Sequence, residues 1–288
     1  MRQITVAGLL LVIGVLAAGP LFARVTPGNR HATEKGSLAV LLGPSVTLTS
    51  TAWDKDGGDI DLNGIRTSIP LVLGLSYGII DGLDAGVDVS AVRNAMDSDT
   101  SLGAREFALG ARYQIELGET NGLLLGAKFK IDMGPNPTPP EPGTSDQQNG
   151  LEFGIDYNVM LGRSLGLRLG TGLVLHFESA DTKLQSGILI DPSIGLWVAM
   201  SKSVTLGIDV GYASQTDAKL SGNDVADSGY SIAYAAPWLL WQIGSSNALG
   251  FGLFSTDEDM ATGIAIMGKN ANANRIAVNL AWRGTFGL

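Results

Sequence analysis

Hydrophobic and polar residues alternate with a period of two along most of the chain from Gly36 onward, not with the 3.6-residue period of a helix. The clearest run extends from Leu151 to Leu161, where every odd position is apolar or aromatic and most even positions are polar or glycine. A second run extends from Val204 to Ala213. Clusters of Gly, Asp, Asn and Ser separate such runs, as expected for strands joined by turns. The pattern predicts an all-β chain.

The alternation predicts twelve strands, and an even number suits a closed barrel. Their ranges are 38–48, 65–79, 85–91, 107–117, 123–131, 151–161, 167–177, 188–198, 204–213, 233–243, 249–253 and 276–282. Short connectors at 81–83, 118–122, 162–165, 201–203 and 244–247 alternate with longer polar segments at 51–63, 94–104, 134–150, 179–187, 214–229 and 255–274. Short turns at one end and long loops at the other are typical of an antiparallel up-and-down transmembrane β-barrel.

The charged residues of these predicted strands all fall on the polar register. Because an Arg or Lys that faces lipid at mid-depth costs on the order of 2–4 kcal/mol, this separation predicts that one register faces lipid and the other lines a lumen. The charged positions of the lumen register are Arg66, Asp88, Arg112, Glu116, Lys128, Lys130, Asp132, Glu152, Asp156, Arg168, Glu178, Asp191, Asp209 and Arg283.

Aromatic residues on the apolar register gather near the two ends of the predicted strands. Those near the short turns are Tyr77, Tyr113, Tyr157, Trp241 and Trp282, and those near the long loops are Phe107, Phe129, Phe153, Phe177 and Tyr212. Two aromatic belts are typical of the membrane interfaces of a barrel. The core of a soluble β-sandwich would not sort its aromatic residues by strand end.

The composition supports the same picture. The chain of 288 residues is 16% charged, whereas roughly a quarter is usual in soluble domains. Its net charge of -9 argues against a nucleic-acid partner. The absence of cysteine excludes a disulfide framework, a thiolate zinc site and a cysteine nucleophile.

The N-terminus has the parts of a secretory signal peptide, namely a positive Arg2, an apolar stretch over residues 4–18 and small residues up to Ala23. A retained anchor is the rival interpretation, but about 20 apolar residues are needed to span a bilayer. We predict a signal peptide at 1–23, a polar lead at 24–35 and a barrel at 36–288.

With these features, the chain from Gly36 to Leu288 resembles the bacterial outer-membrane β-barrel proteins. Its last run keeps one parity from Ile276 to the C-terminus, like the assembly signal of that family, although it ends in Leu288 and not in an aromatic residue. The resemblance implies a location in the outer membrane of a Gram-negative bacterium. It implies as partners outer-membrane lipid and lipopolysaccharide, the barrel-assembly machinery and a small-molecule solute, with no cofactor.

Twelve-stranded members of this family include narrow porin-like channels for nucleosides, acidic sugars and hydrophobic aromatics, and also a phospholipase and a lipid-A deacylase. The resemblance indicates the architecture and does not choose among them. We expect a narrow channel for passive diffusion of small solutes. The alternative is a structural or surface-interaction barrel whose interior is plugged.

The lumen charges allow two interpretations. They pair across strands and partly close the interior, or they line a watered path with weak cation preference. Arg112, Lys128 and Lys130 form a compact basic cluster, and we expect it to pair with Glu116 and Asp132, because buried charges need partners.

Tyr230, Tyr234 and Trp238 recur every four residues on the inward register of one strand, and Trp197 is also inward. These rings would form a slide for aromatic or apolar solutes, or would fill a narrow interior. The sequence leaves both interpretations open.

Enzymatic chemistry has few candidate residues, because only His31 and His176 could serve as the usual general base. His176 is expected on the lumen register opposite Glu152, with Asp156 nearby, but it lacks the His-x-Ser spacing of the outer-membrane phospholipases. We therefore predict no enzyme and no metal site, with a lipid-modifying role of His176 as the weaker alternative.

Two loops suggest binding or gating roles. The loop Asp54–Asp61 is acidic but fails the EF-hand pattern, since Ile65 stands at its twelfth position, and we expect a solvated loop. The proline-rich loop 135–142 is stiff by composition. It would fold inward as a constriction or remain a stiff external loop.

Overall fold

The computed structural model describes residues 17–18, 32–96, 99–118, 121–134, 148–253 and 264–287. All regular secondary structure in these residues is β-strand. Within the same residues, no helix is long and apolar enough to cross a membrane. The predicted signal peptide and the cleavage point near Ala23 lie outside them, apart from the two-residue strand β1 (Ala17–Ala18), which pairs with β3 and β4.

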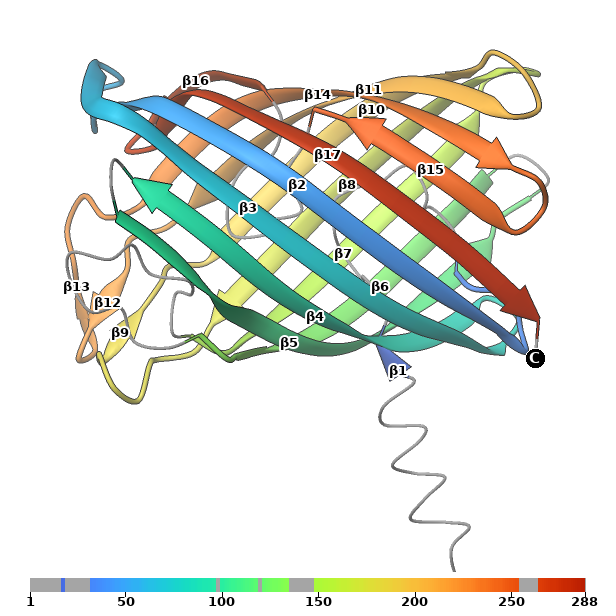
Figure 1. Cartoon of the computed structure of the whole chain (residues 1–288), viewed down its shortest axis with the longest axis horizontal. Helices are drawn as coiled ribbons and strands as arrows, with labels where there is room; N and C mark the ends of the chain where they lie inside the picture. Colours follow the sequence, from blue (N-terminus) through green and yellow to red (C-terminus); the bar gives the residue numbers. More distant parts are fainter. Residues whose placement is uncertain are drawn as a thin grey trace, which may run out of the picture.

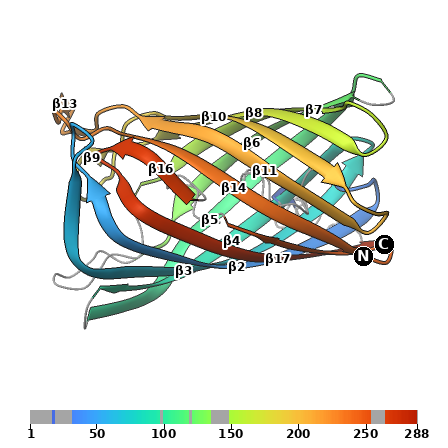
Figure 2. The same cartoon turned by 90° about the horizontal axis from the view of Figure 1, so that it is seen from above.

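The large strands form a closed antiparallel ring (Figures 1 and 2). They are β2 (Ser37–Trp53), β3 (Asp59–Ile80), β4 (Leu83–Met96), β5 (Asp99–Glu116), β6 (Asn121–Asp132), β7 (Gly150–Met160), β8 (Leu165–His176), β10 (Leu189–Ala199), β11 (Val204–Gln215), β14 (Tyr230–Ile243), β15 (Asn247–Gly252), β16 (Ile264–Lys269) and β17 (Asn272–Gly287). From β2 to β15 each of these strands pairs with the next of them along the chain. β15 then pairs with β17, and β17 pairs with β2 to close the ring.

The ring has twelve strand positions, as the alternation predicted. β15 and β16 pair with successive stretches of the same edge of β14, so the two together make one strand of the wall. The pairing of β17 with β2 closes the sheet on itself, which is what a lipid environment demands of a sheet.

The short connectors and the C-terminal end of β17 lie at one end of the barrel. Three short strands lie at the other end, on the loops 177–188 and 216–229 (Figure 1). These are β9 (Leu184–Gln185), β12 (Lys219–Leu220) and β13 (Asn223–Asp224), which form a separate small sheet. We call the two ends the turn end and the loop end.

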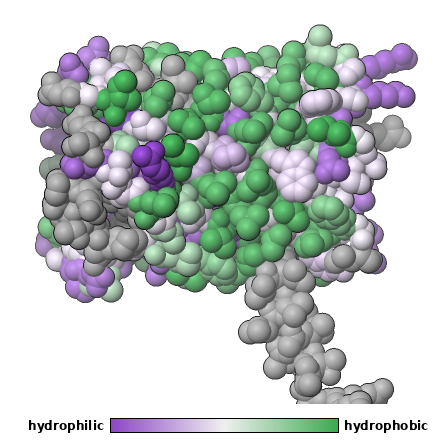
Figure 3. Space-filling view, in the orientation of Figure 1, coloured by the Kyte–Doolittle hydropathy of each residue, from purple (hydrophilic) through white to green (hydrophobic). Residues whose placement is uncertain are grey.

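Burial alternates along the wall in the sense opposite to that of a water-soluble protein. On β7, Ile155 is 49% exposed, whereas Glu152, three residues earlier and on the opposite face, is 4% exposed. Ile208 is likewise exposed beside the buried Asp209. Hydrophobic side chains cover most of the middle of the face shown in Figure 3, and hydrophilic ones gather at the two ends. The outer wall is therefore built to face hydrocarbon, and the polar register faces inward.

Three predicted loops are wrong in extent. β4 and β5 leave only residues 97–98 of the predicted connector 94–104, and the predicted connector 51–63 shrinks to 54–58. The predicted connector 255–274 contains β16 and the start of β17. The reason is that strand ends beyond the bilayer still pair through their backbones, while both of their faces meet water and show no alternation.

Candidate functional site

The interior of the barrel is the candidate site, because the fold collects most of the charged residues of the spanning strands there. Alternation on each strand points these side chains inward. The buried inward charges are Asp84, Asp88, Arg112, Lys128, Lys130, Glu152, Arg168, Asp191 and Asp209. Charges removed from water need partners, so the arrangement of pairs determines the shape of the interior.

Two lysines on β6 pair with carboxylates on both neighbouring strands. Lys128 Nζ lies 3.1 Å from Glu152 Oε2, and the two residues are register partners on β6 and β7. Lys130 Nζ lies 3.2 Å from Glu106 Oε2 on β5. Both lysines are buried. The basic cluster is therefore neutralised across strands and does not present a free row of positive charge to the lumen.

Arg168 on β8 bridges two acidic residues on different strands. Its guanidinium pairs with Asp156 of β7, and its Nη1 lies 3.5 Å from Asp209 Oδ1 of β11. Nη1 also donates to Ser193 Oγ at 3.2 Å. Gly195 lies between, and a Cβ there would come closer than 3.0 Å to the Asp209 carboxylate. A glycine is needed at this position for the arginine to reach across β10.

Two tryptophan rings lie flat over glycines of neighbouring strands. A Cβ at Gly207 would overlap the indole of Trp238, and a Cβ at Gly166 would overlap the indole of Trp197, each closer than 3.0 Å. Trp238 Nε1 donates to Asp209 Oδ2 at 2.8 Å. The missing side chains create the space that lets these rings lie against the wall.

Tyr234 repeats this arrangement, because its ring covers Gly211 and its hydroxyl donates to Asp191 Oδ1 at 3.0 Å. Tyr234 and Trp238 belong to an apolar cluster on β8, β10, β11 and β14. Its other buried members are Val174, Leu189, Ala213, Ile232 and Ala236, with Trp197 and Tyr230 packed against them. One side of the interior is thus aromatic and apolar, and the side formed by β4 to β8 is charged.

The turn end of the interior holds a segment of the polar N-terminal lead. Thr33 is buried, its amide donates to Asp84 Oδ2 at 2.6 Å, and its hydroxyl lies 2.8 Å from Ser76 Oγ. Asp84 also pairs with Arg112. Arg283 Nη2 donates to Thr33 Oγ1 at 3.3 Å. Residues 32–36 are therefore tied to the inner wall close to the short turns.

His176 lies near the loop end, where its Nδ1 is 3.2 Å from the backbone oxygen of Gly187. Its register partner is Gly150, and the partner of Glu152 is Val174. His176 is therefore two residues further toward the loop end than the predicted position opposite Glu152. The reason is the register of the β7–β8 hairpin, in which Met160 pairs with Gly166.

Other predicted residues do not join the buried interior. Arg66, Glu116 and Glu178 are exposed near strand ends, and Asp132 and Arg283 are half-buried. The predicted pairing of the basic cluster with Glu116 and Asp132 is not what the structure shows. The cross-strand stagger brings Asp84, Glu152 and Glu106 to Arg112, Lys128 and Lys130 instead. The predicted proline-rich loop 135–142 lies outside the described residues. In the acidic loop, Lys55 Nζ lies 3.8 Å from Asp227 Oδ2, and the described residues contain no group of three or more His, Asp or Glu that could hold a metal ion.

Sequence reasoning missed Asp84, Glu106 and Thr33. Asp84 and Glu106 share the parity of the other inward charges on β4 and β5, and starting each predicted strand one residue earlier would have included them. Thr33 carries no comparable signal, because the lead before the first strand has no period.

The described inward side chains that are buried or half-buried include eight acidic residues and five basic ones. The acidic members are Asp84, Asp88, Glu106, Asp132, Glu152, Asp156, Asp191 and Asp209, and the basic members are Arg112, Lys128, Lys130, Arg168 and Arg283. Among the described residues, inward carboxylates therefore outnumber inward cations.

Comparisons with known proteins find relatives by structure alone. No protein-family model matches the chain, and no curated protein matches it in sequence. The chain is similar to an outer membrane channel from Pseudomonas putida F1, with a TM-score of 0.75, 14% identity, and coverage of 91% of this chain and 100% of that one. It is also similar to the beta domain of the Bordetella autotransporter BrkA, with a TM-score of 0.50, 10% identity, and coverage of 88% and 100%.

At these identities the likeness concerns the fold, and one fold serves several functions. The order of strands, the apolar outer wall and the polar interior agree with it throughout the described barrel. The chain therefore has the fold of a bacterial outer-membrane porin-like barrel, closed by twelve strands.

Proposed function

We propose that this protein is a channel in the bacterial outer membrane through which small solutes diffuse passively. The observation that carries the proposal is a closed ring whose outer wall is apolar and whose inner wall is charged. Twelve strands lie between eight, where side chains fill the interior, and sixteen or more, where a wide aqueous channel opens. A narrow path with no covalent chemistry and no cofactor suits this geometry.

The ion pairs limit the width of the proposed path. Arg112 and Lys128 are each only 1% exposed, so these charged side chains are packed into the inner wall and are not bathed by lumen water. We therefore propose a low conductance, well below that of wide porins. The excess of inward carboxylates adds a preference for cations over anions.

The aromatic side of the interior favours solutes with an apolar or aromatic part. Tyr234 and Trp238 are buried, and the half-buried Trp197 and Tyr230 pack against them, so Trp197 and Tyr230 are the rings that a solute can reach. Stacking of a nucleobase on an aromatic side chain contributes about 1–3 kcal/mol, and other aryl groups offer the same flat face. We propose aromatic or apolar small molecules as the preferred class.

Planar-bilayer recording of the purified protein tests the channel. We expect small conductance steps and, in a salt gradient, a reversal potential of cation-selective sign. Liposome-swelling assays with sugars, nucleosides and aromatic alcohols of matched size test the solute class, and Trp197→Ala should lower the advantage of the aromatic solutes. Lys202→Ala, on an exposed turn, is the matched control. A protein that inserts and shows no steps above background refutes the proposal.

The burial of the inward charges also favours a second candidate, a barrel with a plugged interior whose external loops do the work. In that case the bilayer recordings would stay silent. Deleting the loop sheet of residues 217–228 would then abolish surface adhesion or envelope integrity and leave solute uptake unchanged.

Export belongs to the same proposal. A signal peptide cleaved near Ala23 places the mature N-terminus a few residues before the segment that enters the barrel. N-terminal sequencing of the protein isolated from outer membranes tests the cleavage, and a mature chain that still begins at Met1 contradicts it.

A further inference from the structure

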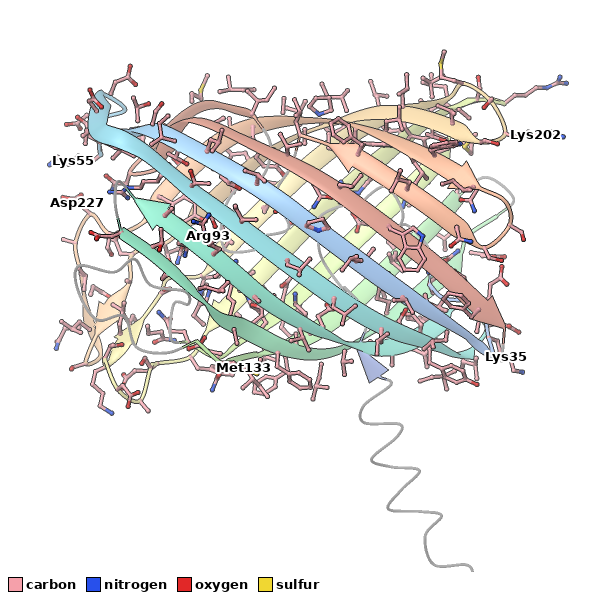
Figure 4. The ribbon with its side chains drawn as sticks, viewed as in Figure 1. Lys35, Lys55, Arg93, Met133, Lys202 and Asp227 are labelled. Carbon is pink, nitrogen blue, oxygen red and sulfur yellow. The ribbon has the colours of Figure 1, made fainter. Side chains whose placement is uncertain are left out.

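One strand of the inner wall carries a run of hydroxyl groups and no charge. β2 crosses the barrel from near Lys35 at the turn end to near Lys55 at the loop end (Figure 4). Val46 and Leu48 are 39% and 45% exposed, whereas Thr47 between them is 5% exposed. The odd-numbered residues of β2 therefore face inward. From the middle of the strand to the loop end these inward residues are Ser45, Thr47, Thr49 and Thr51.

The neighbouring strands on one side add no charge beside these hydroxyl groups. β15 turns Ala248, Gly250 and Gly252 inward, and all three are buried. β17 adds the buried Asn279, which is the register partner of Ser45. The buried ion pairs lie elsewhere, on β4 to β8 and β11. We call this uncharged part of the wall the polar lane, and its members are Ser45, Thr47, Thr49, Thr51 and Asn279.

Three oxygen atoms of the polar lane are buried without a hydrogen-bond partner among the described residues. They are Thr47 Oγ1, Thr51 Oγ1 and Asn279 Oδ1. Asn279 is 0% exposed, and its Nδ2 donates to the backbone oxygen of Pro44 at 3.4 Å. Buried oxygen atoms without a partner are rare and destabilising in a folded protein. On the inner wall of a barrel, a group that enters from the lumen can supply the missing hydrogen bond.

The polar lane repeats along β2 at a regular spacing. Successive inward residues of a strand lie about 7 Å apart, so Thr47, Thr49 and Thr51 offer a hydroxyl group at each step toward the loop end. Several weak sites in series let a solute bind and still leave. A charged solute would lose hydration here and find no counter-charge on this strand. The polar lane therefore suits neutral solutes with hydroxyl groups.

The apolar cluster of the interior begins next to the polar lane. Trp238 pairs with Gly252, and Gly252 pairs with Asn279. Because adjacent strands lie about 4.8 Å apart, the backbones of Trp238 and Asn279 are separated by roughly 10 Å, and the residue between them has no side chain. Resting on the channel function proposed above, we propose that the polar lane binds the hydroxyl groups of neutral solutes whose other face is apolar or aromatic.

Ligand-observed NMR titration of the detergent-purified protein tests the polar lane without requiring flux. The probes are phenyl glucoside and its tetradeoxy analogue, which has the same two rings and no hydroxyl group. The double variant T47V/N279L removes two of the unpaired oxygens at nearly constant side-chain volume. It should bind phenyl glucoside at least about fivefold more weakly than the wild type, because each lost hydrogen bond weakens binding severalfold. Its affinity for the tetradeoxy analogue should not fall.

Matched variants control for the exchange itself. Thr171→Val makes the same change on the lipid-facing side, where Thr171 is exposed and pairs with the outward Ile155, and it should leave both affinities unchanged. Thr47→Ser keeps the hydroxyl group and should keep the wild-type affinity. Heat-modifiable migration on gels shows which variants are folded. If the double variant does not fold, Thr47→Val alone should still weaken the binding of phenyl glucoside by about twofold or more.

The outcomes separate the polar lane from the channel function. Binding of phenyl glucoside that depends on the lane oxygens, together with silent bilayer recordings, supports the polar lane and contradicts the channel. Ion conductance together with equal binding of phenyl glucoside by T47V/N279L and the wild type shows that the polar lane holds water only, and it overturns the inference. An equal loss of affinity for both probes also overturns it, because the variant would then have disturbed the apolar wall.

Discussion

The buried pair of Lys128 and Glu152 provides the sharpest test of how the interior is built. Lys128 Nζ and Glu152 Oε2 are 3.1 Å apart, and the two side chains are 0% and 5% exposed. Removing one partner of a pair so far from water leaves the other buried charge with less compensation, which costs up to about 3–5 kcal/mol. We expect Lys128→Met and Glu152→Gln each to lower the free energy of unfolding by that amount.

The double variant K128M/E152Q should be less destabilised than the sum of the two single variants, by about 2 kcal/mol or more. The reason is that no uncompensated charge remains once both are gone. The exposed pair Lys55 and Asp227 is the internal control, because its atoms are 3.8 Å apart and its side chains are 60% and 70% exposed. Such pairs contribute about 0–1 kcal/mol.

Equilibrium unfolding in urea from lipid vesicles, followed by tryptophan fluorescence, measures all of these differences. The chain has five tryptophans to report on the wall. If the single variants cost less than about 1 kcal/mol and add without coupling, water reaches the pair. The interior would then be an open path with solvated charges, and our account of a narrow lumen would be wrong.

Further predictions concern the glycines that lie beneath the aromatic rings, the lead segment and the acidic loop. Gly207→Ala should destabilise by about 1–3 kcal/mol, because its methyl group would meet the Trp238 ring; Gly172→Ala, with nothing within 4 Å, should be neutral in the same unfolding assay. Thr33→Val removes the hydroxyl contacts with Ser76 and Arg283 and keeps the amide bond to Asp84. It should raise the single-channel conductance by loosening the lead at the turn end, and an unchanged conductance would show that the lead does not restrict the path. Hydrogen bonds from the amides of Gly58 and Asp56 lower the pKa of Asp54 from its ordinary value of 3.8. The ionised carboxylate therefore stabilises this turn at pH values above 3.8, and the stabilisation is lost as the pH falls through the lower pKa of the folded state. Carboxyl chemical shifts of Asp54 by NMR would detect this, and a midpoint above 3.8 would contradict it.

The interior that these tests address has two sides with different chemistry. The pairs on β5, β6 and β7 stabilise a charged wall, while Trp238 and Tyr234 make an apolar wall whose polar atoms are held by Asp209 and Asp191. A solute that crosses such a path meets a ring face on one side and fixed charges on the other. This asymmetry makes the swelling assays with aromatic and non-aromatic solutes informative.

The amino-acid sequence by itself determined the sidedness of the wall. Positions such as Ile155 and Ile208 could be assigned to the outer face because a strand turns alternate side chains to opposite faces, and lipid accepts only one kind. That property is local, so it is written in each strand separately. Closure into a ring follows as well, since a sheet in hydrocarbon has no tolerable free edge.

Only the tertiary structure decided which groups meet. Lys128 pairs with Glu152, not with the predicted Asp132, because the stagger between neighbouring strands selects the partner and no periodicity within one strand encodes it. The entry of Thr33 into the barrel and the bulge between β4 and β5 have the same origin. Contacts between segments depend on register, and register is a property of the assembled ring.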